Sequence, residues 1–156
     1  MIHLINNIIT DLECNELISY YKLNENKIIK NENDNVYHFY GTNIIDEIDM
    51  FMFTKRFFKK LNIVDRLRIQ HLNDTINYVE TPHGHYLPFS LIIFLNDEFD
   101  GGELIFDNII ITPKKKQIVY FTGDELHYVK PVISGDRYTL VSFLNSDLNI
   151  TKTSLL

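Results

Sequence analysis

Apolar residues recur at helical spacing in two stretches near the start of the chain. From 11 to 22 the stripe follows Thr10 and Glu13, which can bond each other's backbone as a capping box and so begin a helix. A second stripe runs from 46 to 61, with lysine and arginine gathered near its C-terminal end, where the helix dipole favours cations. The pattern predicts two helices, over 11–22 and 46–61.

The rest of the chain changes character. Residues 23–45 are polar and rich in turn formers, and they predict a loop around at most a short strand at 27–30. After Asn62, short runs of β-branched and aromatic residues alternate with turn residues, as is typical of strands. The predicted strands cover 66–72, 75–80, 89–95, 103–106, 108–112, 117–121, 126–132 and 137–144. Two helices followed by strands favour a mainly β fold, an antiparallel sandwich or jelly roll with the helices on one side.

Length and composition narrow the class of protein. The 156 residues suit one compact domain with a hydrophobic core, so we expect a single domain over 1–156. Hydrophobic residues make up 45% and charged residues 23%, which is close to globular averages and excludes wholesale disorder. The net charge of -6 disfavours nucleic acid and anionic lipid surfaces as partners.

Cysteine usage and the N-terminus bear on the compartment. Cys14 is the single cysteine, so no disulfide can form within the chain and a reducing setting fits best. The opening "MIHLINNIIT" lacks the basic region and apolar core of a signal peptide, and no apolar run reaches the roughly 18 to 20 residues that span a bilayer. We therefore expect a cytoplasmic protein without a membrane anchor.

Two of the six histidines have the spacing of metal ligands. His83 and His85 flank Gly84 in an extended stretch, where residues two apart point to the same face and glycine allows a close backbone approach. A third ligand from a distant strand would complete one face of an octahedron and leave open positions on the metal. His127 is the candidate for that ligand. The alternative is that His83 and His85 are polar residues of a loop and that His127 is a strand-end histidine bonded to a neighbouring backbone group.

The strand-rich half carries an ordered set of motifs. A strand ending in Leu-Asn runs into an acidic turn with Gly-Gly-Glu; then come a strand that starts at proline, a phenylalanine, a histidine, a Pro-Val pair, a glycine and a basic residue. In this chain the set is Leu95-Asn96, Gly101-Gly102-Glu103, Pro113, Phe121, His127, Pro131-Val132, Gly135 and Arg137. This order resembles the core of the 2-oxoglutarate and Fe(II)-dependent dioxygenases, particularly their prolyl 4-hydroxylase-like branch. The stretch "IITDLECNELISYYK" is similar to that family's opening helix.

The resemblance implies a double-stranded β-helix, or jelly roll, with the two N-terminal helices packed on one sheet and iron at its mouth. It makes His127 the distal iron ligand and Arg137 the residue that binds the far carboxylate of 2-oxoglutarate. Thr139 matches a hydroxyl residue that assists this binding, and Tyr78 matches a tyrosine that hydrogen-bonds the same carboxylate. A planar guanidinium on a strand is suited to this role, because it binds a carboxylate through two parallel hydrogen bonds. The implied activity is hydroxylation of a prolyl or other protein side chain, or of a small molecule.

The proximal iron motif departs from the family's His-x-Asp, and two placements are open. In the first, His83 and His85 occupy that motif and the site holds three neutral imidazoles. In the second, "HGHYLPFS" aligns so that Phe89 replaces the first ligand and the aspartate is missing, leaving a protein that binds iron poorly. The first placement predicts metal binding that falls steeply below about pH 6, the ordinary range of histidine.

Other readings compete with an active dioxygenase. A degenerate, inactive member of the family would keep the jelly roll as a binding or assembly module. A cupin would also carry His-x-His, but "YLPFS" offers no glutamate after it. A nucleic-acid demethylase is disfavoured by the acidic charge. We assign Gly101-Gly102 to a tight turn rather than to catalysis, and Lys114-Lys115-Lys116 to a solvated hairpin tip.

Overall fold

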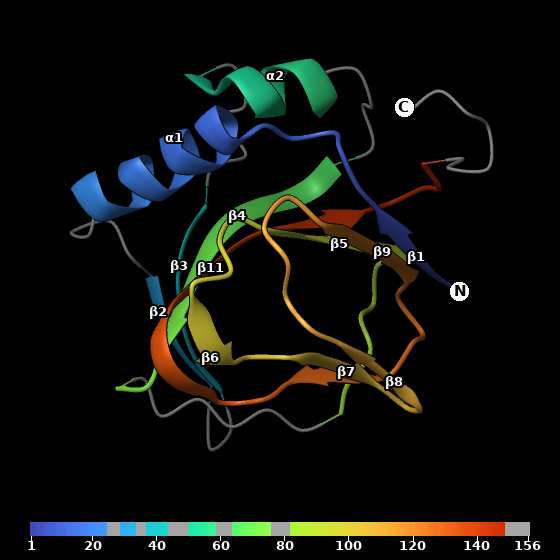
Figure 1. Ribbon diagram of the computed structural model, residues 1–156. Helices are drawn as coiled ribbons and strands as arrows, with labels where there is room; N and C mark the ends of the chain where they lie inside the picture. Colours follow the sequence, from blue (N-terminus) through green and yellow to red (C-terminus); the bar gives the residue numbers. More distant parts are fainter. Residues whose placement is uncertain (25–28, 34–36, 44–49, 59–63, 76–81, 149–156) are drawn as a thin grey trace.

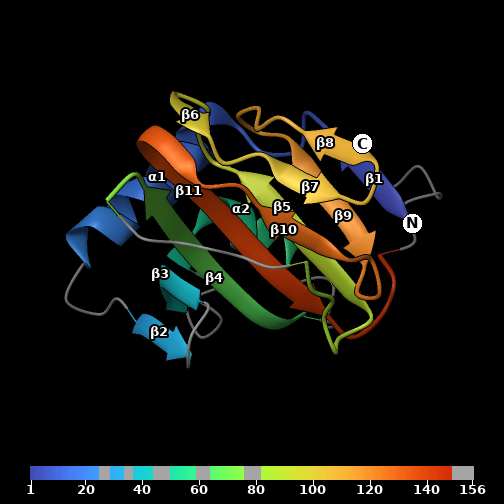
Figure 2. The ribbon, with the colours of Figure 1, turned by 90° about the horizontal axis from the view of Figure 1, so that it is seen from below.

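Two antiparallel β-sheets face each other, and helices cover the outside of the larger one (Figure 1). The computed structural model describes residues 1–24, 29–33, 37–43, 50–58, 64–75 and 82–148. The larger sheet has the order β1-β9-β5-β11-β4-β3-β2, and the smaller has the order β10-β7-β8 (Figure 2). The strands of the larger sheet are β1 (Ile2–Ile5), β2 (Ile29–Asn33), β3 (Tyr37–Asn43), β4 (Val64–Asn73), β5 (Phe89–Phe94), β9 (Ile118–Thr122) and β11 (Val132–Leu144). Those of the smaller are β7 (Leu104–Phe106), β8 (Ile109–Ile111) and β10 (His127–Val129), while β6 (Phe99–Gly101) pairs with β11. This is the predicted jelly roll.

Alternation along the strands of the larger sheet creates two hydrophobic cores. On β9, Ile118 and Tyr120 face the helices, whereas Val119 and Phe121 face the smaller sheet. The inner core also takes residues from the smaller sheet, namely Leu104, Phe106, Ile111 and Val129. Because both faces of β5 and β9 are covered, these strands are almost continuously apolar, which explains the run "SLIIFL".

The helices lie where the sequence placed them. α1 (Asp11–Leu23) begins at Thr10 with the predicted capping box, in which Glu13 N–H donates to the Thr10 hydroxyl and Thr10 N–H donates to the Glu13 carboxylate. α2 (Met52–Phe57) is shorter than the predicted 46–61; residues 46–49 and 59–61 lie outside the described residues. Arg56 of α2 binds the buried carboxylate of Glu13 at 2.9 Å, which joins the two helices.

Several strands differ from the prediction. The segment predicted as a loop around at most a short strand at 27–30 forms two strands: β2, which overlaps that short strand, and β3. Both extend the larger sheet beyond β4. β1 pairs with β9 and β6 pairs with β11, although neither strand was predicted. The predicted strand at 75–80 lies almost wholly outside the described residues.

β11 is longer than predicted because a bend, not a turn, occupies its start. Its first residues pair with β6 and its later residues pair with β4 and β5, so the strand curls from one sheet to the other (Figure 1). Gly135 has a φ of 81° at the bend, next to a shift in strand register between Val132 and Ser134. The bend brings Arg137 to the inside of the molecule.

The lysines at the tip between β8 and β9 were predicted to be solvated, and two of them instead form ion pairs. Lys115 and Lys116 each lie 3.3 Å from a carboxylate oxygen of Asp11 at the start of α1. These exposed ion pairs connect the hairpin to the helix.

Candidate metal centre

His83 and His127 lie opposite each other on two neighbouring segments of the chain. The backbone N–H of each donates to the carbonyl of the other at 3.0 Å, which forms an isolated antiparallel bridge. Residues paired in this way project their side chains to the same face. The two imidazole rings accordingly lie 4.6 Å apart between centroids. A local loop and a strand that follows it by more than 40 residues thus meet at one point.

His85 completes the cluster. Its Nε2 lies 3.0 Å from Nε2 of His127, and ligand nitrogens of all three histidines lie within 4.8 Å of one another. Two neighbouring ligands of an octahedral ion at about 2.1 Å from each nitrogen would be roughly 3.0 Å apart. The His85–His127 pair has this spacing, and the third predicted histidine, His83, lies beside it.

The hydrogen bond of His127 fixes which of its nitrogens can bind a metal. Its Nδ1 lies 2.8 Å from the carbonyl oxygen of Glu125, and because a carbonyl only accepts, Nδ1 must carry the proton. Nε2 of the neutral ring then holds a lone pair directed at His85. Metal-ligating histidines commonly donate their second N–H in this manner.

Burial favours the uncharged form of His85 and His127. It lowers the pKa of His85 to about 3, and the charges of His127, His83 and Arg68 act in the same direction. Burial also lowers the pKa of His127 to about 4, although the hydrogen bond to the Glu125 carbonyl opposes this shift. Neutral imidazoles are the metal-binding form, so the site is ready for a cation at neutral pH.

Two glycines allow the backbone to pack tightly behind the histidines. A Cβ on Gly84 would lie 2.8 Å from the carbonyl oxygen of Gly123, and a Cβ on Gly123 would lie 2.0 Å from that of Leu87. His85 N–H also donates to the Gly123 carbonyl at 2.7 Å. The close approach expected at Gly84 is confirmed, and Gly123 is its unpredicted partner.

The placement in which Phe89 replaces a ligand does not fit. Phe89 stacks on Tyr120, with 5.6 Å between ring centroids, and packs against the core under the helices. The histidines lie on the other face of the sheet, where His127 contacts Phe121 and His85 contacts Phe143. His83 and His85, not Phe89, are the residues beside His127.

Arg137 and Thr139 also face the inside, on the same face of β11 as the inner-core residue Val141. The exposed fraction of Arg137 is only 2%, and its guanidinium lies 5.4 Å from the centre of the Phe94 ring. The Thr139 hydroxyl is buried and has no hydrogen-bond partner in the part of the chain that the structure describes. A buried cation beside a free hydroxyl suits an anionic ligand. Tyr78, the other predicted helper, lies outside the described residues.

Gly102 contacts the side chain of Arg137, a role that was not predicted when it was assigned to a turn. The Nε–H of Arg137 donates to the Gly102 carbonyl at 3.0 Å. Gly102 has a φ of 67°, and a Cβ there would lie 2.7 Å from Cδ of Arg137. The glycine therefore leaves room for the arginine side chain and also holds its guanidinium.

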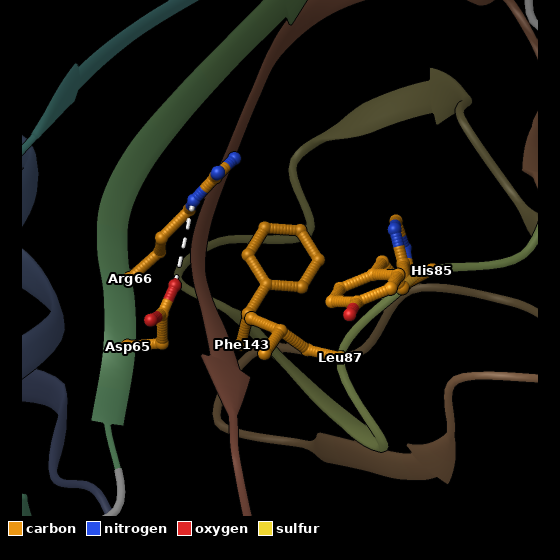
Figure 3. A pocket seen from close by; sticks show the side chains of 6 residues that line it. Asp65, Arg66, His85, Leu87 and Phe143 are labelled. Carbon is orange, nitrogen blue, oxygen red and sulfur yellow. Dashed lines mark ion pairs between the residues drawn. The ribbon is translucent and has the colours of Figure 1, made fainter.

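A cavity of about 300 Å³ adjoins His85 on its open side (Figure 3). Phe143 from β11 and Leu87 from the histidine loop form apolar walls, while Asp65 and Arg66 of β4 form an exposed ion pair at 3.6 Å. Phe143 lies opposite Arg66 in the strand register and contacts the His85 ring at 4.6 Å between centroids. Sequence motifs gave no signal for this cavity, because its residues are adjacent only through strand pairing.

Comparison with known proteins agrees with this arrangement. The model of the 2OG-Fe(II) oxygenase superfamily matches residues 69–145, which include all three histidines and Arg137. A PKHD-type hydroxylase of Hyphomonas neptunium is 34% identical over 64 residues; the match covers 38% of this chain and 29% of that protein. The chain therefore spans under a third of the length of that curated relative.

Solved structures share the fold. The viral collagen prolyl hydroxylase of Paramecium bursaria Chlorella virus-1, in its 2OG complex, is 19% identical with a TM-score of 0.66, over 91% of this chain and 94% of that one. A Pseudomonas putida prolyl-4-hydroxylase is 12% identical with a TM-score of 0.68, over 93% and 92%. Within the described residues, no helix is long and apolar enough to cross a membrane.

Proposed function

We propose that this chain, which belongs to the 2OG-Fe(II) oxygenase superfamily, is an Fe(II)- and 2-oxoglutarate-dependent dioxygenase that works with three histidine ligands. The observation that carries the proposal is the convergence of His83, His85 and His127, with nitrogens within 4.8 Å of one another, on a jelly roll shared with prolyl hydroxylases. Enzymes of this superfamily use Fe(II) and 2-oxoglutarate.

The three histidines would hold the iron through neutral nitrogens. His127 would bind through Nε2, since its Nδ1 donates to the Glu125 carbonyl. Three imidazoles leave the ferrous site one unit more positive than two imidazoles and a carboxylate would, which favours an anionic co-substrate. When bound, the iron supplies the oxidation of a substrate C–H bond together with 2-oxoglutarate and O2.

Arg137 and Thr139 would bind the far carboxylate of 2-oxoglutarate. The guanidinium is buried, so its attraction for a carboxylate is weakened little by water. The Thr139 hydroxyl has a donor to offer to the same group. Phe94, Phe121 and Val141 line the inner core around them and exclude water from the space between the sheets.

The substrate would enter through the cavity beside His85. Its volume of about 300 Å³ and its mixed lining suit one amino-acid side chain or a small molecule. Prolyl or other protein side chains are therefore the first substrates to test. The net charge of -6 supports a substrate other than nucleic acid.

An inactive binding module is the less favoured alternative. Its support was Phe89 in place of a ligand, and Phe89 lies on the opposite face of the sheet from the histidines. The structure leaves three convergent imidazoles that such a module would not need.

Conversion of 2-oxoglutarate to succinate and CO2, with and without added Fe(II), tests the proposal. The wild-type protein should form succinate only with iron, and His127→Ala should form none above background. His3→Ala is the matched control, because His3 stacks on Tyr120 on the outer face of the sheet. Failure of the wild type to form succinate and to retain any metal would overturn the proposal.

A further inference from the structure

Asn96 holds the backbone of Arg137 on both sides. Its side-chain Nδ2 donates to the carbonyl oxygen of Asp136 at 2.7 Å, and its Oδ1 accepts the N–H of Tyr138 at 2.9 Å. Those two groups belong to the peptide bonds that flank Arg137. Asn96 itself is 8% exposed, so water competes little for these bonds.

The two hydrogen bonds of the Asn96 side chain continue the larger sheet at the point where β5 and β11 separate. The regular pairing of β5 with β11 reaches Thr139 opposite Phe94, and one further bond joins Leu95 N–H to the Tyr138 carbonyl. At the next residue the chain turns towards β6, and the Asn96 side-chain amide takes the place of a backbone amide. Since a carboxamide has the same donor and acceptor as a peptide group, it can extend the ladder by one pair.

We propose that Asn96 is a positioning residue for Arg137: by binding the peptide groups on either side, it fixes where the buried guanidinium meets the far carboxylate of 2-oxoglutarate. This inference rests on the proposed function. The Gly102 carbonyl acts on the same side chain from its other end, through its bond with Nε. Backbone and side chain of Arg137 are thus held by separate residues, and Arg137 loses little freedom when a carboxylate binds.

A purely structural role for Asn96 makes a different prediction. If the amide only stabilised the fold, its loss would weaken every ligand of the site alike, or none. A positioning role confines the loss to ligands that carry the far carboxylate. 2-Oxobutyrate is the suitable probe, because it keeps the 2-oxo acid end of 2-oxoglutarate and lacks that carboxylate.

The experiment compares the Kd of the two ligands on Mn(II)-loaded protein by isothermal titration calorimetry, without oxygen. In the wild type, 2-oxoglutarate should bind much more tightly than 2-oxobutyrate. Asn96→Ala should raise the Kd of 2-oxoglutarate about 10-fold, the effect of weakening one hydrogen bond between the guanidinium and the far carboxylate, and leave that of 2-oxobutyrate within about twofold. Asn96→Asp keeps the acceptor for Tyr138 N–H and opposes an oxygen to the Asp136 carbonyl, so it should behave similarly, and it serves if the alanine variant does not fold.

Asn73→Ala is the matched control. Its Nδ2 donates to a side-chain carboxylate oxygen of Asp136 at 3.3 Å, so both Kd values should stay unchanged. Equal losses for both ligands in the Asn96 variants, or no loss, would overturn the inference while wild-type binding of 2-oxoglutarate still supports the proposed function. If the wild type itself binds neither ligand, the proposed function fails as well.

Discussion

His83 and His127 are joined by two reciprocal backbone hydrogen bonds of 3.0 Å, and this bridge brings two rings of the candidate metal centre together. The rings belong to segments that are far apart in the chain, yet their separation depends on the backbone rather than on flexible side chains. His85 then joins from the same loop, because Gly84 and Gly123 let that loop lie against the end of β9. The site is therefore largely formed before any metal binds.

Each of the three histidines should be necessary for tight metal binding. Replacement of His83, His85 or His127 by alanine removes one of three ligands. We expect Mn(II) affinity to fall by about 100-fold or more, beyond the 10- to 100-fold typical of changes to residues that only orient a ligand. Calorimetric titration of Mn(II) measures this. His3→Ala should bind as the wild type does, and a single cluster histidine that can be removed without loss would mean that the ion binds elsewhere.

The second prediction concerns the charge and shape of Arg137. Arg137→Lys keeps the positive charge but loses the planar fork and the Nε bond to Gly102. We expect the Kd of 2-oxoglutarate to rise about 10- to 100-fold, while Mn(II) affinity stays the same. Arg66→Lys, at the exposed edge of the cavity, is the control and should leave 2-oxoglutarate binding intact. An unchanged Kd in the Arg137 variant would exclude it as the carboxylate clamp.

Gly102 can be separated from other strained glycines. Gly102→Ala places a Cβ 2.7 Å from Cδ of Arg137, whereas Gly101→Ala introduces a similar strain at a φ of 79° and places its Cβ against the backbone of Pro131 and Ile133. Both variants should lose thermal stability through their positive φ. Only Gly102→Ala should also weaken 2-oxoglutarate binding, by about 10-fold, the size of one hydrogen bond to a charged group. Equal effects of the two substitutions on 2-oxoglutarate Kd would contradict the role of Gly102.

The pH dependence of the metal-free protein follows from the lowered pKa values. In the unfolded chain His85 and His127 take up protons near their ordinary pKa of 6.5, but in the folded protein they do so only near about 3 and about 4. The unfolded state therefore binds more protons between these values, and stability present above pH 6.5 is lost as the pH falls towards 4. Urea unfolding at pH 7.5, 6 and 5 should show this decline, which His127→Gln should flatten. An identical decline in that variant would argue against the buried neutral ring.

Metal binding should depend less on pH than unperturbed histidines imply. The sequence alone predicts a steep loss below about pH 6, with three rings taking up protons together. Because the pKa values of His85 and His127 lie well below that range, these two rings should release no proton when the metal binds between pH 5 and 7. The slope of the logarithm of Mn(II) affinity against pH measures the number of protons released. A slope of two or three would show that the cluster titrates as exposed histidines do.

The sequence predicted the residues of the site better than their supports. His127 and Arg137 could be located because the family motif orders them, but Pro131 prevented any deduction that they face the same side. The structure shows both inside, because β11 bends at Gly135. Asn96 binds the backbone of Asp136 and Tyr138 across 40 and 42 positions of the chain, and Gly102 binds Arg137 across 35; no local spacing reveals such contacts.

Edge strands were the main elements that the sequence hid. β2 and β3 join the larger sheet through backbone hydrogen bonds, which do not depend on the side chains. A segment as polar as "KNEN" shows no alternation of apolar residues, so the sequence gives no sign of a strand there. β1 was hidden because four residues are too few to show a period. The central strands β4, β5 and β9 were predicted within two residues, since burial dictates their composition.

Binding of 2-oxoglutarate with and without Mn(II) shows whether the histidine cluster and Arg137 form one site. Titration of 2-oxoglutarate into the Mn(II)-loaded wild type should show one site per chain, and this binding should disappear in the metal-free protein and in His85→Ala. Binding of equal affinity with and without metal, or none to the Mn(II)-loaded wild type, would contradict the account.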